Sequence, residues 1–343
     1  MKQNMYTVFT LTFLIFLVSS SPSDQSEQHS PVRSIIIDAD TGNEIDDQYA
    51  IVRALVEPSF QVKAICSAQY HTQNQAPENT VQISQNQNER ILQLMNLQHI
   101  PHPIGSNLPL PDANTPQTSD AAQIIINIAH SMENGQVLDV VVLGAMTNVA
   151  SAILMDSTII NKIRVHAMGL HYDPITKVWD KNEFNTNNDV NAMNLVLDTK
   201  GLDLQIMTAS TSINLVFFKE VVDEKLKGKN GVWDFLVQRW EEYLLTKTWS
   251  SPLANETQWV MWDIAIIEAL ANPELATKVS VMTPPENSQR PIEVYREIDA
   301  EAMQKEYWDA LEKAMKTKYF LKSPYIPKMN QLLIRIIQYY WEI

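Results

Sequence analysis

Short apolar runs rich in β-forming residues alternate along this chain with segments of helical periodicity, and this alternation constrains the fold most. Six runs are predicted to be strands, at residues 34–38, 61–66, 138–144, 163–168, 203–208 and 278–282. The helical patterns between them are at residues 47–56, 84–97, 121–133, 148–154 and 189–199. Strands that alternate with helices usually form parallel sheets. We therefore expect the α/β class, with a single doubly wound, mostly parallel sheet and helices on both faces.

Two later segments, residues 218–246 and 259–271, also have helical patterns. The first carries Trp233 and Trp240 and is long enough for one or two helices. We expect these helices to form a flap over a site.

The N-terminus differs from the rest of the chain. Lys2 precedes an apolar run at residues 6–18, and small residues follow it. This pattern predicts a secretory signal peptide over residues 1–21, a polar linker over 22–32 and one domain over 33–343. A spanning helix needs about 20 apolar residues, so we expect no stable membrane insertion after signal cleavage. The expected location is exported, either periplasmic or secreted.

Composition excludes several classes of protein. The formal net charge of −14 argues against a nucleic-acid polymer as partner, because phosphates are bound by clustered Lys and Arg. Cys66 is the single cysteine, so neither an internal disulfide nor a multi-thiolate metal site can form. The sequence contains neither G-x-G-x-x-G nor a P-loop motif. Small neutral or cationic ligands remain open.

An acidic turn directly follows the first predicted strand and contains Asp38, Asp40, Glu44, Asp46 and Asp47. Carboxylates this close repel one another unless a proton or a cation neutralises them, and such oxygen ligands suit Ca²⁺ or Mg²⁺. Open α/β sheets bind their ligands at the carboxyl ends of strands. The later acids could instead cap the next helix, but capping does not account for Asp38 and Asp40.

Three further segments end strands or open helices and carry polar groups suited to the same site. They are residues 142–148 (VLGAMTN), 182–185 (NEFN) and 262–265 (WDIA). Helix capping or core packing explains each of them equally well when it is taken alone. Their order around the acidic turn favours a shared site.

Together these residues resemble the nucleoside hydrolase family, the calcium-dependent N-ribohydrolases that cleave ribonucleosides to ribose and free base. The family signature DxDPGxDD is similar to Asp38-Ala39-Asp40-Thr41-Gly42 followed by Asp46-Asp47, and the block LGAMTNVASAI is closer still. The resemblance covers about residues 34–284. It implies Ca²⁺ as cofactor and a small-molecule nucleoside as substrate, and it leaves a homo-oligomer open.

The resemblance also implies roles for particular residues. Asp40 would be the catalytic general base and a metal ligand. The other Ca²⁺ ligands would be Asp47, Asp263 and the main-chain carbonyl of Thr147. The expected substrate-binding residues are Asp46, Met168, Asn182, Glu183, Asn185, Trp262 and His71.

The sequence departs from the family pattern in several places. Two residues are inserted between Gly42 and the paired aspartates, and Thr41 replaces the usual proline. After the second strand the family often has Gly-Asn, whereas this chain has Ser67-Ala68-Gln69-Tyr70-His71, so a ribose contact has either moved to His71 or been lost. Trp262 stands where pyrimidine-tolerant members carry a histidine, which predicts a preference for purine nucleosides.

Two alternative functions compete with this hypothesis. A haloacid-dehalogenase-type phosphatase would use Asp38 as nucleophile, Asp40 as acid and Mg²⁺ as cofactor. That alternative leaves Asp46, Asp47 and residues 182–185 unexplained. The other alternative is a secreted protein that binds ribose or a nucleoside without turnover. An assay with a nucleoside and a phosphate ester separates the enzymes, and ligand retention without release of base would favour the binding protein.

Overall fold

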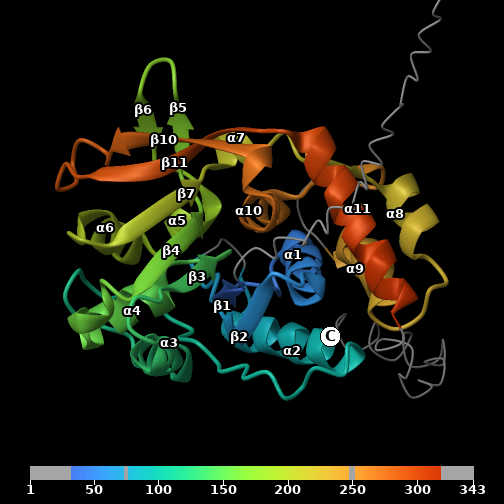
Figure 1. Ribbon diagram of the computed structural model, residues 1–343, viewed down its shortest axis with the longest axis horizontal. Coiled ribbons are helices and arrows are strands. Elements are labelled where there is room, and N and C mark those ends of the chain that lie inside the picture. Colours follow the sequence, from blue (N-terminus) through green and yellow to red (C-terminus); the bar gives the residue numbers. More distant parts are fainter. Residues whose placement is uncertain (1–31, 73–75, 247–251, 318–343) are drawn as a thin grey trace, which may run out of the picture. The chain divides into compact units, whose positions relative to one another are not determined.

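A seven-stranded sheet lies at the centre of the fold in the computed structural model, which describes residues 32–72, 76–246 and 252–317 (Figure 1). The strand order is β10-β11-β7-β4-β3-β1-β2. Only the edge strand β10 (Ala276–Met282) is antiparallel, to β11 (Pro291–Ile298). The parallel partners are β1 (Arg33–Ala39), β2 (Phe60–Ser67), β3 (Leu138–Val142), β4 (Ile163–Met168) and β7 (Asp203–Met207). The predicted mostly parallel sheet is confirmed.

The sheet is covered on both faces, which explains the continuous apolar runs Ile35–Ile37 of β1 and Val140–Val142 of β3. Ile35 and Ile37 of β1 belong to one hydrophobic core, and Ile36 between them belongs to the other. The first core includes residues of α1 (Asp46–Val56), α2 (Thr80–Leu94), α8 (Lys219–Leu226), α9 (Val232–Thr246), α10 (Trp262–Ala271) and α11 (Ala300–Lys316). The second includes α3 (Asp120–Ser131), α4 (Thr147–Met155) and α6 (Val190–Asp198). The doubly wound arrangement is therefore confirmed.

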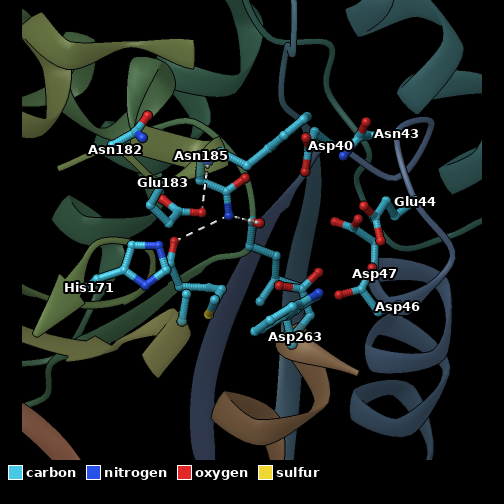
Figure 2. Close-up of a pocket in the computed structure, with 15 residues that line it drawn as sticks. Asp40, Asn43, Glu44, Asp46, Asp47, His171, Asn182, Glu183, Asn185 and Asp263 are labelled. Carbon is cyan, nitrogen blue, oxygen red and sulfur yellow. Dashed lines mark hydrogen bonds between the residues drawn. The ribbon is translucent and has the colours of Figure 1, made fainter. Parts of the chain in front are cut away.

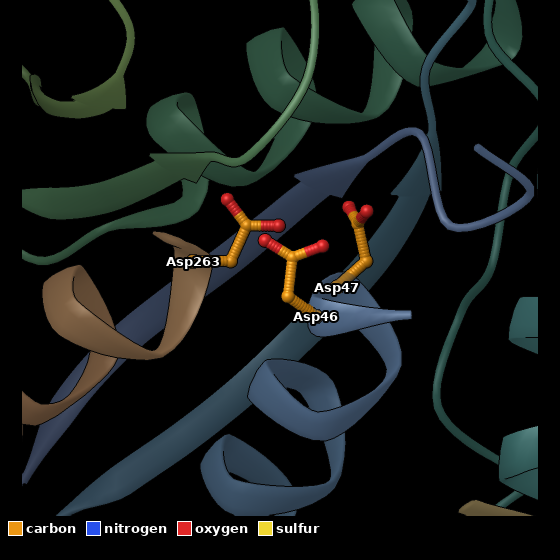
Figure 3. A group of neighbouring side chains, drawn as sticks. All are labelled: Asp46, Asp47 and Asp263. Carbon is orange, nitrogen blue, oxygen red and sulfur yellow. The ribbon is translucent and has the colours of Figure 1, made fainter. Parts of the chain in front are cut away.

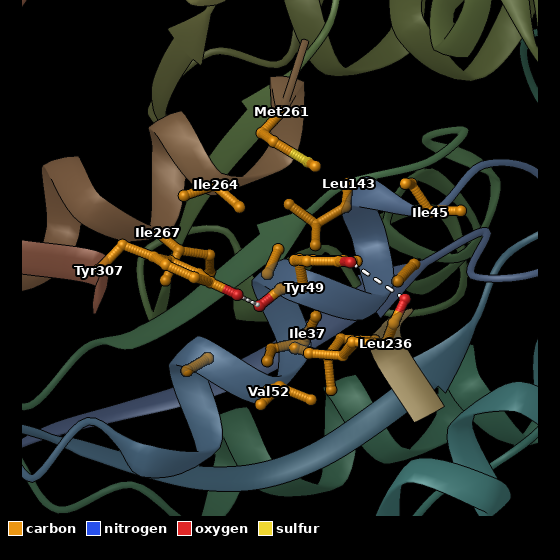
Figure 4. Close-up of a cluster of buried hydrophobic side chains, with 14 of the residues drawn as sticks. Ile37, Ile45, Tyr49, Val52, Leu143, Leu236, Met261, Ile264, Ile267 and Tyr307 are labelled. Atoms are coloured by element: carbon orange, nitrogen blue, oxygen red, sulfur yellow. Dashed lines mark hydrogen bonds between the residues drawn. The ribbon is translucent and has the colours of Figure 1, made fainter. Parts of the chain in front are cut away.

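Helix α1 is fixed in the first core by a buried tyrosine (Figure 4). The Tyr49 hydroxyl donates to the Leu236 carbonyl of α9 at 3.0 Å, and the Tyr307 hydroxyl of α11 donates to the Tyr49 carbonyl at 3.4 Å. Tyr49 lies one turn after the start of α1 at Asp46. These contacts therefore hold the N-terminal turn of α1 in place, and that turn carries two of the predicted site aspartates.

The segment 218–246 forms two helices, α8 and α9, as its pattern predicts, and Trp240 is fully buried in the first core. Other elements differ from the sequence prediction. The helix predicted from residue 259 begins at Trp262, because residues 258–260 form a strand. The elements that were not predicted include β11, α11, α5 (Phe184–Asn188), α7 (Ala209–Ser212), and the strand pairs β5 (His171–Asp173) with β6 (Val178–Asp180) and β8 (Val216–Phe218) with β9 (Gln258–Val260).

Two predictions concern the ends of the chain. The predicted signal peptide and all but the last residue of the predicted linker lie outside the described residues. Within the described ranges, none of the helices combines the length and the apolar character that crossing a membrane requires.

Candidate active site

The candidate site lies at the carboxyl ends of β1 and β3, where the strand order reverses. From β1 the sheet continues to β2 on one side and to β3 and β4 on the other. Such a switch point leaves a crevice outside the strand ends, where doubly wound proteins bind ligands. Here the crevice holds a cavity of about 260 Å³, which suits a small molecule.

The cavity is lined predominantly by acids and amides (Figure 2). Its carboxylates are Asp40, Glu44, Asp46, Asp47, Glu183 and Asp263, its amides are Asn43, Asn182 and Asn185, and its one histidine is His171. Leu143, Met168, Phe184, Ala209 and Trp262 complete the lining. Among these described lining residues there is neither Lys nor Arg. The cavity therefore carries a strong excess of negative charge.

Three of the aspartates form a tight group (Figure 3). Asp46, Asp47 and Asp263 each offer a carboxylate oxygen, and these oxygens lie within 4.8 Å of one another. Asp46 and Asp47 are in the first turn of α1, and Asp263 is in the first turn of α10. A helix N-terminus stabilises a negative charge by only about 0.3–1 kcal/mol. Two helix ends do not compensate for three buried carboxylates, each at most 3% exposed.

Because the charges of these acids are not compensated, their pKa values are raised. Burial raises the pKa of Asp46 to about 8, and the charge of Glu44 adds to the effect. Burial and then the charge of Asp47 raise the pKa of Asp263 well above its usual range. The pKa of Asp47 is also raised, by burial and then by the charge of Asp40. The pKa of Asp40 is raised by burial and then by the charge of Asp46. A bound cation would favour the ionised forms.

The oxygen positions fit a hard divalent cation. Asp40 Oδ2 and Asp47 Oδ1 are buried and have no hydrogen-bond partner among the described residues. Ca²⁺ binds oxygens at about 2.3–2.6 Å, so ligands on opposite sides of the ion lie about 5 Å apart. The 4.8 Å limit on the group of three agrees with this spacing. The resemblance gave Asp40 a ligand position and Asp46 a ribose contact, whereas the structure gathers Asp46 with Asp47 and Asp263 and places Asp40 beside them in the lining.

Glu183 and Asn185 lie on the other side of the cavity from Asp46 and Asp47 (Figure 2). Glu183 caps α5, and its two carboxylate oxygens accept from the backbone N–H groups of Asn185 and Thr186 at 3.0 and 2.9 Å. The Asn185 amide donates to the carbonyls of Leu143 and Met168 at 2.7 and 3.2 Å. Asn185 is thus tied to the ends of β3 and β4, and its Oδ1 is oriented without a hydrogen bond among the described contacts. This oxygen can accept from a ligand hydroxyl.

Of the other predicted site residues, Met168, Asn182 and Trp262 line the cavity, but Thr147 and His71 do not. The Thr147 hydroxyl donates to Asp189 Oδ2 at 2.7 Å and accepts from Gln69 Nε2 at 3.2 Å. The backbone N–H of His71 donates to the same Gln69 side chain at 2.6 Å. His71 and Thr147 therefore belong to a polar network behind the lining.

Asp38 also lies behind the lining. Asn148 Nδ2 donates to Asp38 Oδ1 at 2.9 Å, and burial raises the pKa of Asp38 to about 7. The phosphatase alternative needs Asp38 as a nucleophile in the cavity. The structure instead keeps this side chain out of the cavity lining.

Sequence reasoning did not assign three polar lining residues to the site, namely Asn43, Glu44 and His171. Asn43 and Glu44 belong to the inserted part of the acidic turn. The buried Trp259 indole donates to Glu44 Oε2 at 3.0 Å, so the insertion is tied to β9. Glu44 belongs to the acidic turn that predicted a cation site, but helix capping explains an acid at this position equally well. His171 flanks the Met168 turn in the sequence, but a lone histidine there is more often structural or at the surface than catalytic, and the β5–β6 hairpin that it begins was not predicted.

Comparisons with known proteins agree with this geometry. The family model described as "Inosine-uridine preferring nucleoside hydrolase" matches residues 35–305. Among solved structures, a plant nucleoside hydrolase has a TM-score of 0.65 at 17% identity, covering 82% of this chain and 99% of that one. An inosine-guanosine nucleoside hydrolase has a TM-score of 0.63 at 20% identity, covering 82% and 98%.

A purine-preferring ribonucleoside hydrolase from Gardnerella vaginalis has a TM-score of 0.64 at 17% identity, covering 83% of this chain and 99% of that one. No curated protein sequence matches this chain. At these identities the solved structures support the fold alone, and the family model supports the assignment to a family.

Proposed function

This chain belongs to the inosine-uridine preferring nucleoside hydrolase family and is a hydrolase that acts on N-glycosyl compounds, and we propose that it uses Ca²⁺ to cleave purine ribonucleosides to ribose and free base. The observation that carries this proposal is the cavity at the switch point, with six carboxylates and no Lys or Arg among its described lining residues. A cavity of this charge favours ligands that bring a cation or many hydroxyl donors.

The residues that would hold Ca²⁺ are Asp47 and Asp263, supported by Asp46 and Asp40. When bound, Ca²⁺ would supply the positive charge that orients a water molecule and the ribose hydroxyls. The main-chain carbonyl of Thr147 remains a proposed ligand, because its hydroxyl bond to Asp189 fixes the residue just behind the cavity.

Asp40 is the proposed general base. Its Oδ2 has no hydrogen-bond partner among the described residues, so it can accept the proton of an attacking water. Cleavage of the N-glycosidic bond builds positive charge on the sugar, and the surrounding carboxylates stabilise that charge. Asn185 Oδ1 would accept from a ribose hydroxyl, and Met168 would pack against the sugar ring.

Purine preference rests on Trp262. This residue opens α10 and lines the cavity beside Asp263. Stacking on an indole stabilises an aromatic partner by about 0.5–1.5 kcal/mol beyond buried area, and the larger purine ring offers the larger face. Gardnerella's purine-preferring enzyme and the inosine-guanosine enzyme are similar in fold, which agrees with this proposal.

The test is ribose release from inosine, guanosine and uridine by metal-depleted protein, with and without added Ca²⁺. We expect ribose from the purine nucleosides only when Ca²⁺ is present, and no phosphate from a phosphate ester. Retention of nucleoside without ribose release would identify a binding protein instead. Phosphate release alone would identify a phosphatase.

We also propose that the protein is exported to the periplasm or secreted. The support is the charged and apolar N-terminal segment, residues 1–21. N-terminal sequencing of protein recovered from the periplasm or the medium should begin near residue 22. Recovery of the protein only from the cytoplasm with residue 1 or 2 at its N-terminus would contradict export.

A further inference from the structure

The departing base needs a proton, and the carboxylates of the cavity are committed to other roles. Asp40 is the proposed base, and the group of Asp46, Asp47 and Asp263 is the proposed cation site. Glu44 accepts from the Trp259 indole at 3.0 Å, which ties it to β9. Glu183 accepts from two backbone N–H groups and from the Thr186 hydroxyl at 2.9 Å, so its oxygens hold α5 in place. The remaining lining residue suited to proton donation is His171.

A constrained turn presents His171 to the cavity. Leu170, just before it, has a φ of 60°, a left-handed conformation that a leucine rarely adopts. Its N–H donates to Glu183 Oε2 and to Thr186 Oγ1, both at 3.2 Å, and its carbonyl accepts from the Ala209 N–H at 2.9 Å. A strained residue persists when its surroundings over-determine it, and such residues cluster at functional sites. The turn fixes the direction in which the chain leaves β4 at Met168.

The surroundings of the imidazole also suit a proton donor. His171 Nδ1 lies 3.4 Å from the Ser210 hydroxyl, which in turn accepts from the Tyr172 N–H at 3.3 Å. Ser210 can therefore hold one ring nitrogen through Nδ1–H, which leaves Nε2 to act on a ligand. Figure 2 places His171 on the same side of the cavity as Glu183, across from Asp46 and Asp47. A ribose held by the acids would thus lie between them and His171.

We propose that His171 is a catalytic residue that protonates the departing base, an inference that rests on the proposed nucleoside hydrolysis. The C1′–N bond breaks and its electron pair goes to the base nitrogen. A ring nitrogen of the base takes the Nε2 proton of the His171 imidazolium, which becomes neutral imidazole. Water adds its hydroxyl to C1′ and gives its proton to Asp40. Solvent exchange then returns that proton to the imidazole, so one water is consumed per nucleoside.

The test compares His171→Gln with His130→Gln on two substrates. One substrate is inosine, whose base needs protonation, and the other is 4-nitrophenyl β-D-ribofuranoside, whose leaving group needs none. His130 lies on α3 with its side chain 40% exposed, bound to Asp156, and provides the matched control. We expect His171→Gln to reduce kcat on inosine by about 10²–10⁴-fold and to change kcat on the aryl riboside by less than about tenfold. His130→Gln should retain both activities.

Each other result overturns the assignment. Equal losses on both substrates by a variant that keeps the Tm of the unmodified protein would show that His171 shapes the cavity without donating a proton. Unchanged rates on both would show that it takes no part. Thermal unfolding checks folding, and a variant with a lowered Tm would be compared again as His171→Asn. If the unmodified protein released ribose from neither substrate, the proposed function itself would fail, and the failure would be visible before any variant is made.

Discussion

Two polar clusters on the same sheet contain buried aspartates, but only one of them places arginines beside its aspartates. At the carboxyl ends of the strands, the cavity gathers acids with no Lys or Arg among its described lining residues. Towards the amino ends, Asp139 of β3 accepts from Arg33 and Arg164, each at 3.3 Å, and contacts His166 Nε2 at 2.9 Å. Arg164 also binds Asp203 at 2.6 Å. We call this second group the arginine cluster.

The pKa shifts of the two clusters have opposite signs. Burial alone would raise the pKa of Asp139, but the hydrogen bond to His166 and the arginine charges lower it overall. In the cavity, burial and neighbouring acids act together and raise the pKa of Asp40. Buried charges cost stability unless they are paired. The arginine cluster thus has a structural explanation in its own contacts, whereas the described lining of the cavity offers its acids no Lys or Arg.

The sharpest separation of the two clusters uses one substitution in each. Asp40→Asn keeps the shape of the side chain but removes the proton acceptor, so we expect kcat on inosine to fall by about 10²–10⁴-fold with little change in Tm. Asp139→Asn weakens the arginine cluster and should lower the free energy of unfolding by about 1–3 kcal/mol while kcat per folded molecule stays near normal. Steady-state kinetics and thermal unfolding measure both. Near-normal turnover by Asp40→Asn would place the base elsewhere.

Calcium should stabilise the protein through the cavity alone. A ligand present at about 100 times its Kd stabilises the native state by about 2.7 kcal/mol. We expect added Ca²⁺ to raise the Tm of metal-depleted protein accordingly, and a chelator to reverse the gain. Asp263→Asn should abolish most of this shift, whereas Asp203→Asn in the arginine cluster should preserve it. A shift that survives Asp263→Asn would mean that the ion binds at another place.

The stability of the metal-free protein should fall as pH rises from about 5 to 8. The pKa of Asp46 is about 8 in the folded protein, against an ordinary value of 3.8, so the unfolded chain loses this proton first. Each such group lowers the free energy of unfolding by at most about 1.4 kcal/mol per pH unit within that window. Asp38, with a pKa of about 7, acts in the same direction.

Two groups of the arginine cluster titrate with the opposite sign. Burial lowers the pKa of His166, so its contribution to stability is lost as pH falls below about 6.5. The lowered pKa of Asp139 matters only in acid, because its contribution is lost below its usual range. Thermal unfolding from pH 5 to 8, with and without Ca²⁺, checks the balance. A Tm that rises steadily with pH without metal would show that the arginine cluster outweighs the cavity.

The smallest expected effect concerns the base. Trp262→Ala should reduce the preference for inosine over uridine by about 0.5–1.5 kcal/mol, or roughly twofold to twelvefold in the ratio of kcat/KM values. A folded variant that keeps its selectivity would assign Trp262 to packing alone. Such a result would not change the roles proposed for the cavity acids and would restrict those roles to the sugar.

The sequence predicts those strands and helices whose hydrophobic pattern extends over enough residues to show a period. β4 was predicted with its observed bounds, Ile163–Met168, because Ile163, Val165 and Ala167 alternate with polar residues at the period of a strand. The strands β5, β6, β8 and β9 each have three residues, too few to show a period. Their pairing depends on distant contacts. Of the predicted helical flap, α8 and α9 pack into the core and do not line the cavity, whereas Trp262 and Asp263 of α10 do line it.

The site follows the same rule. Asp40, Asp47 and Asp263 were identified because each lies at the end of an element that the sequence pattern reveals. His171 was not, because its place in the cavity depends on the left-handed Leu170 and on bonds from Glu183 and Thr186. The grouping of Asp46 with Asp47 and Asp263 also depends on how α1 and α10 pack together, since both carry these acids in their first turns.

The most direct test of the contrast between the clusters is a crystal structure of the protein with Ca²⁺ and ribose. We predict one ion in the cavity, with carboxylate oxygens of Asp47 and Asp263 at about 2.3–2.6 Å from it, and no ion at the arginine cluster. An empty cavity, or an ion more than about 5 Å from the Asp263 carboxylate, would contradict the claim that these acids are gathered to hold a cation.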